Sequence, residues 1–187
     1  SLNGYKGIVI IKSTVPPGTT DYLLEKSSLK LCFNPEFLRE SVSANDDFEN
    51  QDLVILGTNN SNIFEDVKTM YSQVLKQNSR YVQVSPTTAE MIKYSQNATL
   101  ASRVAIANII FDACEKFDVD YSVVKSLGFD SFEILGPYMV EVPGPDGKRG
   151  FGGKCLPKDI SGFNSVIESD ILSSIITYNK TLRDDLD

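Results

Sequence analysis

The residues best suited to chemistry are concentrated in residues 150–159, which contain three glycines, two lysines and one cysteine. The glycines allow the backbone to approach a ligand closely and to adopt unusual dihedral angles. Cys155 follows them directly, just before a predicted helix start, where the helix dipole stabilises a thiolate. Lys154 and Lys158 add positive charge, so these ten residues hold what a reactive cysteine nucleophile needs. The alternative is a glycine turn followed by a small buried cysteine.

Lys93 and Asn97 form a second candidate site. They lie four residues apart in a predicted helix, so both side chains project from one face. A lysine and an amide in this arrangement can hold and polarise a substrate oxygen. The alternative is a pair of solvated side chains on the surface of a helix.

Two further candidates follow predicted strands. Glu36 and Glu40 come just after the second strand, and Ser13 and Thr14 end the first. The carboxyl ends of strands are where α/β sheets place their ligands, so these carboxylates and hydroxyls can meet a substrate or a cofactor. The alternatives are two solvated acids on a helical turn and a pair of hydroxyls that cap the next helix.

The composition narrows the chemistry that these groups can perform. The chain has 187 residues, no histidine, three cysteines and a net charge of −7. The absence of histidine excludes His-based triads and most zinc sites, and the acidic balance disfavours binding to a phosphate backbone. No apolar run reaches about 18 residues, so we expect no membrane span. The sparse cysteines are typical of a reducing compartment, and we expect Cys32 and Cys114 to be core residues.

The elements that must position these residues fall into two parts. Short apolar runs alternating with helical spacing predict a parallel α/β sheet up to residue 84. Its predicted strands are residues 7–12, 31–33, 52–57 and 81–84, and its predicted helices are 19–26 and 62–75.

From residue 85 the pattern becomes helical. Thr87 and Glu90 predict a capping box, and the helix that follows runs to about residue 117, a rod of about 45 Å. Such a rod usually joins domains or packs against a partner subunit. The remaining predictions are a helix over residues 121–127, capped by Asp120 and stopped by Gly128; a loop over 136–153; and one final helix from residue 157 to the end.

Four segments, in this order, resemble successive signatures of the UDP-glucose/GDP-mannose dehydrogenase family. They are KSTVPPGT (residues 12–19), NPEFLRE (34–40), AEMIKY (89–94) with Asn97, and GFGGKCLPKD (150–159). The resemblance covers nearly the whole chain. It implies that residues 3–84 are the C-terminal part of a Rossmann-like NAD-binding domain. Residues 85–187 would then be the central helical dimerisation domain, with one long helix and the catalytic cysteine loop.

The resemblance also implies an activity. The family oxidises the C6 alcohol of a nucleotide sugar to a carboxylate with two NAD⁺, without releasing the aldehyde. We expect UDP-glucose as the substrate, with GDP-mannose as the nearest alternative, and a cytoplasmic homodimer joined through the long helix that serves polysaccharide biosynthesis. No metal, nucleic acid or membrane is expected to take part.

Site roles follow from the same resemblance. Cys155 is the nucleophile, Lys93 and Asn97 stabilise oxyanions, and Asp159 positions water or tunes Lys93. Glu36 is the general base, acting through a water that Thr14 holds, unless Thr14 contacts the nicotinamide. The residues expected near NAD are Ser13, Thr14, Glu40 and Lys158. Those expected near the substrate are Glu36, Phe37, Leu38, Arg39, Lys93, Asn97, Arg149, Phe151 and Gly152.

The chain departs from the family pattern in three places. No Gly-x-Gly-x-x-Gly motif follows an early strand, so we expect the first half of the cofactor domain to precede Ser1. The family's C-terminal nucleotide-binding domain would follow Asp187. Residues 130–136 lack an arginine that family members often carry, and Arg149 is the candidate to replace it. We therefore expect the 187-residue chain alone to be inactive.

Two rival functions remain open. A non-catalytic dimerisation module would explain the long helix without any chemistry at Cys155. A 6-phosphogluconate-type dehydrogenase shares the long-helix architecture, but it has no need for a nucleophilic cysteine in a glycine loop.

Overall fold

The computed structural model describes residues 4–37, 44–136 and 139–184. The chain forms two compact units that divide between Lys93 and Tyr94, inside the long helix α4 (Pro86–Lys116). The prediction of one long helix over about residues 87–117 is confirmed. Unit 1 contains a sheet with its helices, and the described part of unit 2 is helical with a long irregular segment, as the α/β and all-α prediction requires.

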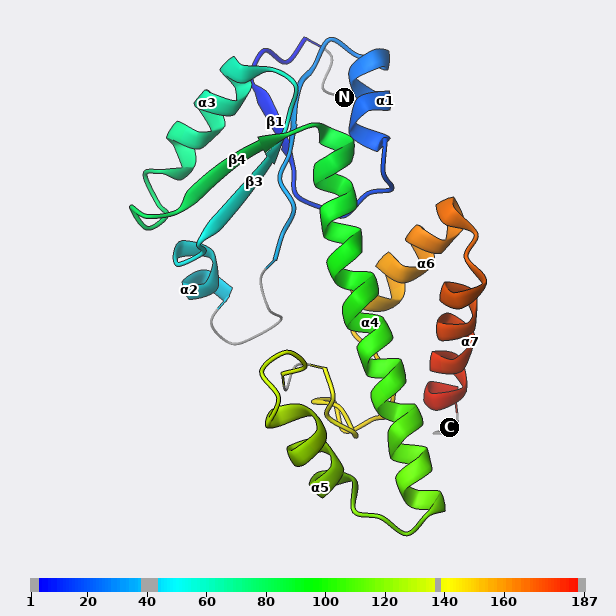
Figure 1. Cartoon of the computed structure of the whole chain (residues 1–187). Helices are drawn as coiled ribbons and strands as arrows, with labels where there is room; N and C mark the ends of the chain where they lie inside the picture. The colour runs from blue at the N-terminus through cyan, green and yellow to red at the C-terminus, as the bar shows by residue number, and fades with distance from the viewer. Residues whose placement is uncertain (1–3, 38–43, 137–138, 185–187) are drawn as a thin grey trace. The chain divides into compact units, whose positions relative to one another are not determined.

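Unit 1 is built on a four-stranded sheet in the order β1-β2-β3-β4, so β1 and β4 are the edge strands within the described residues (Figure 1). β1 and β2 are parallel, as are β3 and β4. β2 and β3 run antiparallel and pair Phe33 with Gly57, so the prediction of a wholly parallel sheet is wrong at this central pair. A parallel neighbour needs a crossover packed on the sheet, whereas the helix described between β2 and β3 has only six residues.

The elements of unit 1 otherwise follow the predicted order. The short helix α2 was not expected from the sequence. The strands are β1 (Ile8–Ile11), β2 (Lys30–Phe33), β3 (Leu53–Gly57) and β4 (Arg80–Val84). The helices are α1 (Thr19–Lys26), α2 (Ala44–Glu49) and α3 (Ser61–Tyr71), together with the first turns of α4.

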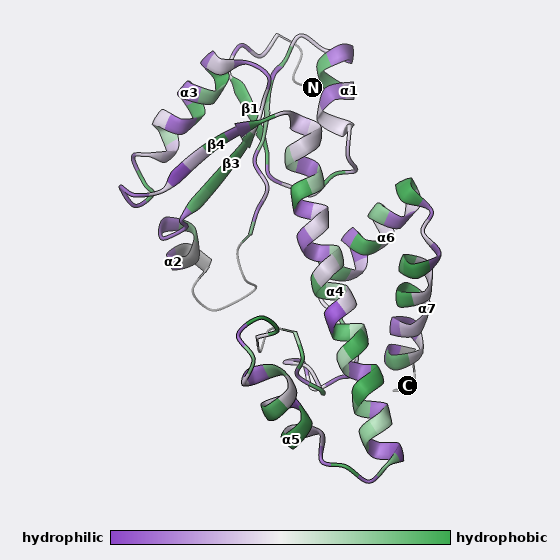
Figure 2. Cartoon of the chain, in the orientation of Figure 1, coloured by the Kyte–Doolittle hydropathy of each residue, from purple (hydrophilic) through white to green (hydrophobic). Residues whose placement is uncertain are grey.

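Both faces of the sheet are covered. Successive residues of a strand point to opposite faces, so Cys32 packs in the cluster of α3 while Phe33 packs with Ala89 at the beginning of α4. Figure 1 shows α3 on one side of the strands and the beginning of α4 on the other, and Figure 2 shows β3 hydrophobic along its length. A Cβ on Gly57 would lie 2.7 Å from the Ala89 Cβ, so only glycine lets β3 approach α4 this closely.

The predicted capping box at the start of α4 is wrong. The helix begins at Pro86, and the Ser85 hydroxyl accepts the N–H of Thr88 at 3.1 Å. Thr87 instead donates its hydroxyl to Asp21 at 2.6 Å, because α1 lies within reach. Glu90 likewise turns away from its own helix start.

Glu90 is fully buried and holds the beginning of α1. Its Oε2 accepts the N–H of Gly18 at 2.6 Å, and its Oε1 accepts the N–H and the hydroxyl of Thr20 at 2.9 and 2.6 Å. The first N–H groups of a helix lack intrahelical partners and favour a negative charge. Since α1 has Gly18 at its N-cap, with φ of +89° and no capping side chain, Glu90 supplies the cap from α4.

The described residues of unit 2 form the rest of α4 and four further elements: α5 (Tyr121–Lys125), the π-helical turn η1 (Ser126–Asp130), α6 (Leu156–Ile167) and α7 (Asp170–Asp184). Asp120 caps α5 through the N–H of Ser122, as predicted. Gly128 does not stop the helix, because the chain continues through η1. The single final helix is also wrong: Glu168 adopts a left-handed conformation, with φ of 54°, and separates α6 from α7.

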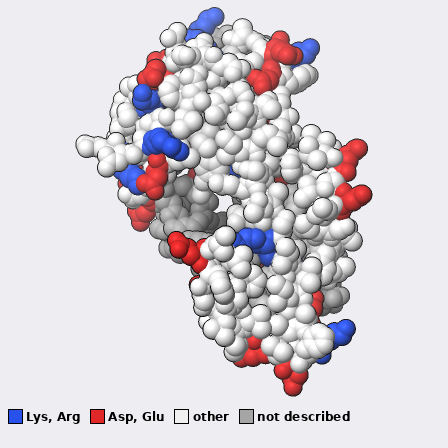
Figure 3. Space-filling view, in the orientation of Figure 1, with Lys and Arg blue, Asp and Glu red and all other residues white. Residues whose placement is uncertain are grey.

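The surface of the described chain has two plain features. Within the described ranges, no helix is both long and apolar enough to cross a membrane. On the face drawn in Figure 3, acidic and basic side chains are scattered over both units, with wide areas of uncharged atoms between them.

Replacing Glu90 should destabilise unit 1. We expect Glu90→Ala to lower the free energy of unfolding by about 3 kcal/mol, because three donors lose a buried acceptor. Glu90→Gln keeps the size and one oxygen, so about half of that loss is expected. Urea unfolding measures both. The control is Glu65→Ala, which removes only a surface pair with Lys68; equal midpoints for Glu90→Ala and this control would contradict the capping role.

Candidate active site

The carboxyl ends of β1 and β2 bring Lys12, Asn34 and Glu36 together. The strands are parallel, with Ile11 opposite Phe33, so the residues that follow them meet at one edge of the sheet. Lys12 Nζ donates to Asn34 Oδ1 at 2.7 Å and lies 3.1 Å from Glu36 Oε2. The Glu36 side chain remains 38% exposed. Its carboxylate is therefore both oriented and reachable.

Asn34 is the buried centre of this edge. Its Nδ2 donates to the Ile55 carbonyl on β3 at 2.9 Å, and its Oδ1 also accepts the Tyr71 hydroxyl of α3 at 2.8 Å. Burial, together with the nearby Cys32 and Glu36, raises the pKa of Tyr71 to about 12. The hydroxyl therefore stays a donor at neutral pH and keeps Asn34 fixed.

The other predicted residues of unit 1 lie close to this edge or on α4. Ser13 is exposed and Thr14 half-buried just after β1. Phe37 packs on the cluster of Phe33, and the Lys93 ammonium lies 5.5 Å from the centroid of the Phe37 ring. Three residues predicted to bind substrate or cofactor lie outside the described residues: Leu38, Arg39 and Glu40.

In unit 2, Cys155 is exposed and precedes the first residue of α6, as predicted. Asp159 lies in the first turn of that helix, and its N–H donates to the Cys155 carbonyl at 2.8 Å. The Asn97 amide donates to Asp159 Oδ2 at 2.5 Å. The structure therefore brings two of the predicted site residues, Asn97 and Asp159, into direct contact, one helical turn from Cys155.

The second oxygen of Asp159 is not used by a hydrogen bond. The side chain is 1% exposed, and Oδ1 lies 2.6 Å from the Lys158 ammonium. This ion pair lacks hydrogen-bond geometry, so Oδ1 has no hydrogen-bond partner within the described chain. A buried carboxylate oxygen with spare acceptor capacity can orient a water or another donor.

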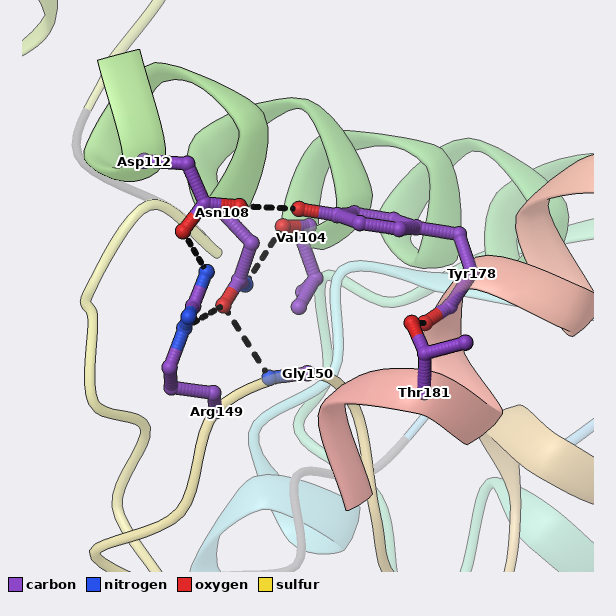
Figure 4. Close-up of polar contacts among 7 residues, drawn as sticks. All are labelled: Val104, Asn108, Asp112, Arg149, Gly150, Tyr178 and Thr181. Atoms are coloured by element: carbon purple, nitrogen blue, oxygen red, sulfur yellow. Dashed lines mark hydrogen bonds and ion pairs between the residues drawn. The ribbon is translucent and has the colours of Figure 1, made fainter. Parts of the chain in front are cut away.

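Arg149 is committed to contacts inside unit 2. Its guanidinium pairs with Asp112, reaches Asn108 Oδ1 at 3.4 Å and lies 5.2 Å from the centroid of the Phe111 ring. Asp112 also accepts the Tyr178 hydroxyl at 2.8 Å (Figure 4). To replace the family arginine at the substrate, Arg149 would have to leave these contacts.

Phe151 and Gly152 adjoin the cysteine loop from its other end. The Phe151 ring is buried with Ala101, Val104 and Ile160 in the core of unit 2. Gly152 is half-buried, and a Cβ there would meet the Arg183 guanidinium at 2.4 Å. The ring of Phe151 thus has a packing role, and its contact with substrate stays a prediction.

Sequence reasoning missed the polar residues that support these groups. Lys12 and Asn34 belong to the quoted motifs but were not singled out. Asn108 and Asn179 are buried, at 1% and 8% exposure, and bind the backbone of the cysteine loop. A polar residue among the apolar positions of a helix, such as Asn108 between Ala107 and Ile109, is the signal that could have found them.

Comparison with known proteins supplies the context for this geometry. Residues 2–75 match the NAD-binding domain of the UDP-glucose/GDP-mannose dehydrogenase family, and residues 87–181 match its central domain. The UDP-glucose 6-dehydrogenase of Rickettsia typhi is 36% identical over 184 residues, which cover 92% of this chain and 41% of that protein.

Solved structures of dehydrogenases resemble this fold. A UDP-glucose dehydrogenase from the archaeon Pyrobaculum islandicum aligns with a TM-score of 0.76 at 27% identity, over 93% of this chain and 41% of its own. A GDP-mannose dehydrogenase from Pseudomonas aeruginosa aligns with a TM-score of 0.57 at 25% identity, over 97% and 44%. The chain spans about two fifths of the length of these relatives.

The two matched domains follow each other in the order that the fold shows, a sheet with its helices and then a helical unit carrying the exposed cysteine. The chain therefore belongs to the UDP-glucose/GDP-mannose dehydrogenase family.

Proposed function

We propose that this chain is part of an NAD-dependent nucleotide-sugar 6-dehydrogenase that oxidises UDP-glucose to the uronic acid. The observation that carries the proposal is the exposed Cys155 at the start of α6, one turn from the buried pair of Asn97 and Asp159. Family membership and 36% identity to UDP-glucose 6-dehydrogenases support the choice of substrate. GDP-mannose is the second candidate.

The residues at the carboxyl edge of β1 and β2 fit a bound NAD. Ser13 and Thr14 offer hydroxyls there, and the sequence matched to the NAD-binding domain includes both. We assign Ser13, Thr14, Glu40 and Lys158 to the cofactor side of the site. When bound, the nicotinamide accepts a hydride from the substrate carbon at each of two oxidations.

Glu36 is the proposed general base of the first oxidation. Its carboxylate takes the proton of the C6 hydroxyl through a water that Thr14 holds, while the carbon loses a hydride and becomes an aldehyde. Lys12 and Asn34 keep this carboxylate oriented. Phe37, Leu38, Arg39, Arg149, Phe151 and Gly152 are the proposed substrate contacts.

Cys155 then captures the aldehyde. Its thiolate forms a C–S bond with the aldehyde carbon, and the carbonyl electron pair moves to oxygen, where the Lys93 ammonium and the Asn97 amide stabilise it. Loss of a second hydride gives a thioester. A water oriented by Asp159 attacks the thioester carbon and gives up its protons to solvent, the C–S bond breaks, and the carboxylate product leaves with the thiolate restored.

Pairing of two copies through α4 is a further part of the proposal. Ile106 and Ile109 are 53 and 54% exposed on this helix, and Phe117, directly after its last residue, is 72% exposed. An apolar groove of about 320 Å³ adjoins them, lined by Ile109, Ile110, Ala113, Cys114, Phe117, Val119 and Val124. A second copy would cover this apolar surface. A non-catalytic dimerisation module would expose the same apolar surface, so this surface alone does not distinguish the two functions.

The longer protein that contains this chain should produce two NADH per molecule of UDP-glucose and none with GDP-mannose, read as absorbance at 340 nm. Cys155→Ser should abolish turnover, because no thioester forms without the thiolate. The 187-residue chain alone serves as the control without activity. Turnover with GDP-mannose only would name the other substrate, and turnover with neither would contradict the proposed activity.

Cys155 should be the thiol that iodoacetamide modifies in the folded chain. Cys32 and Cys114 are buried, and burial raises the pKa of Cys32 to about 12. A catalytic thiol should react faster than free glutathione near neutral pH, as mass spectrometry of timed samples shows. A rate no greater than that of glutathione would favour the dimerisation module.

The chain should be a dimer by size-exclusion chromatography with light scattering at micromolar concentration. Ile109→Glu should yield a monomer, because it places a charge in the apolar groove. Met70→Glu is the matched control, since Met70 is exposed on α3 and distant in sequence from the groove. A monomeric parent chain would contradict pairing through α4.

A further inference from the structure

Side chains hold the loop that leads to Cys155 at the peptide groups of Gly150 and Phe151. Both residues are buried and lie outside any helix or strand. The N–H of Gly150 donates to Asn108 Oδ1 at 3.2 Å, and its carbonyl accepts from Arg183 Nη2 at 3.1 Å. The N–H of Phe151 donates to Asn179 Oδ1 at 2.7 Å, and its carbonyl accepts from Asn179 Nδ2 at 3.0 Å.

All four backbone polar groups of these two residues are thus satisfied by side chains, from α4 and from α7. Buried N–H and C=O groups are usually paired by other backbone, so a loop without a partner strand must find its hydrogen bonds elsewhere. Asn179 matches Phe151 best, because its amide oxygen accepts the N–H of that residue while its amide nitrogen donates to the carbonyl of the same residue. Figure 4 shows Asn108 reaching Gly150 from α4.

The shape of the loop requires these contacts. Gly150 has φ of +70°, and a Cβ there would lie 2.5 Å from Asn179 Oδ1, so only glycine admits the amide. The Phe151 ring packs with Ile160 of α6 in the core, and Leu156 packs against the same cluster. Between the packed residues Phe151 and Leu156, the exposed residues are Gly153, Lys154 and Cys155.

We propose that Asn179 is a positioning residue for Cys155, with Asn108 as its partner on the other side of the loop. It fixes the peptide of Phe151, and this fixes where the chain enters the segment that ends at Cys155. The catalytic meaning of this role rests on the proposed function, whereas the ordering of the loop does not.

Amide hydrogen exchange of the 187-residue chain tests the ordering. In Asn179→Ala the amide of Phe151 and the amide of Asp159, which donates to the Cys155 carbonyl, should exchange about tenfold faster, because the loop loses two hydrogen bonds. The matched control is Asn164→Ala, which also removes an amide with one donor and one acceptor contact between α6 and α7. Acceleration confined to Phe151, or equal acceleration of the Asp159 amide in the control, would overturn the proposal.

Asn179→Asp provides a second experiment, which remains informative if the Asn179→Ala variant does not fold. The carboxylate still accepts from Phe151 N–H but repels the Phe151 carbonyl, whereas the protonated acid can donate to it. Protection of the Phe151 and Asp159 amides should therefore be low at about pH 7 and recover towards about pH 5 as the acid protonates. Protection independent of pH in this variant would contradict the two-point contact.

Kinetics of the full-length enzyme separate the two proposals. Asn179→Ala should lower kcat about 100-fold and leave KM nearly unchanged, because misplacement of the nucleophile affects the reaction more than binding. A rise in KM at constant kcat would overturn the positioning role. If the parent enzyme oxidises no nucleotide sugar, the proposed function fails, and the exchange results decide the ordering of the loop by themselves.

Discussion

Buried backbone groups outside regular structure must find hydrogen-bond partners, and in this chain helix α4 provides many of them. In unit 1, Glu90 satisfies the start of α1, which has a glycine where a capping side chain would stand. In unit 2, Asn108 accepts the N–H of Gly150, and Asn97 donates to the buried side chain of Asp159. The segments that carry the candidate chemistry are irregular or lie at helix ends. Their geometry therefore depends on polar side chains buried within a helix.

The predictable part of the fold is the part governed by local pattern. The β-branched runs and helical spacing located all four strands and the long helix, because both faces of the sheet are buried and the apolar periodicity is unbroken. The failures have tertiary causes. Thr87 and Glu90 have the spacing of a capping box, but α1 lies close enough to take both side chains. The left-handed turn at Glu168, which divides the final helix, has no glycine to announce it.

The sequence identified residues of the candidate site, but it did not predict which of their side chains contact one another. Motif order identified Cys155, Asp159 and Asn97, and contact between the last two is present. The supporting residues escaped notice because an asparagine among apolar helix positions indicates burial but does not identify its partner. Asn179 in α7 matters only because the loop folds against it, and Lys12 only because β1 and β2 are parallel and in register. These relations are long-range, so the spacing of residues does not encode them.

The edge position of β1 has a practical consequence. Its residues, Ile8–Ile11, are apolar and β-branched, and the strand pairs on one side with β2. Among the described residues no strand pairs with its other edge, and such an edge is a template for another strand, against which nearby charges are the usual protection. Lys12, at one end of the strand, is already paired with Asn34 and Glu36. Lys6, two residues before the other end, is therefore the lysine that remains to oppose strand association. Recombinant handling of the chain is therefore expected to be limited by edge-to-edge association, and a lysine introduced on the outer face of β1 is the natural remedy.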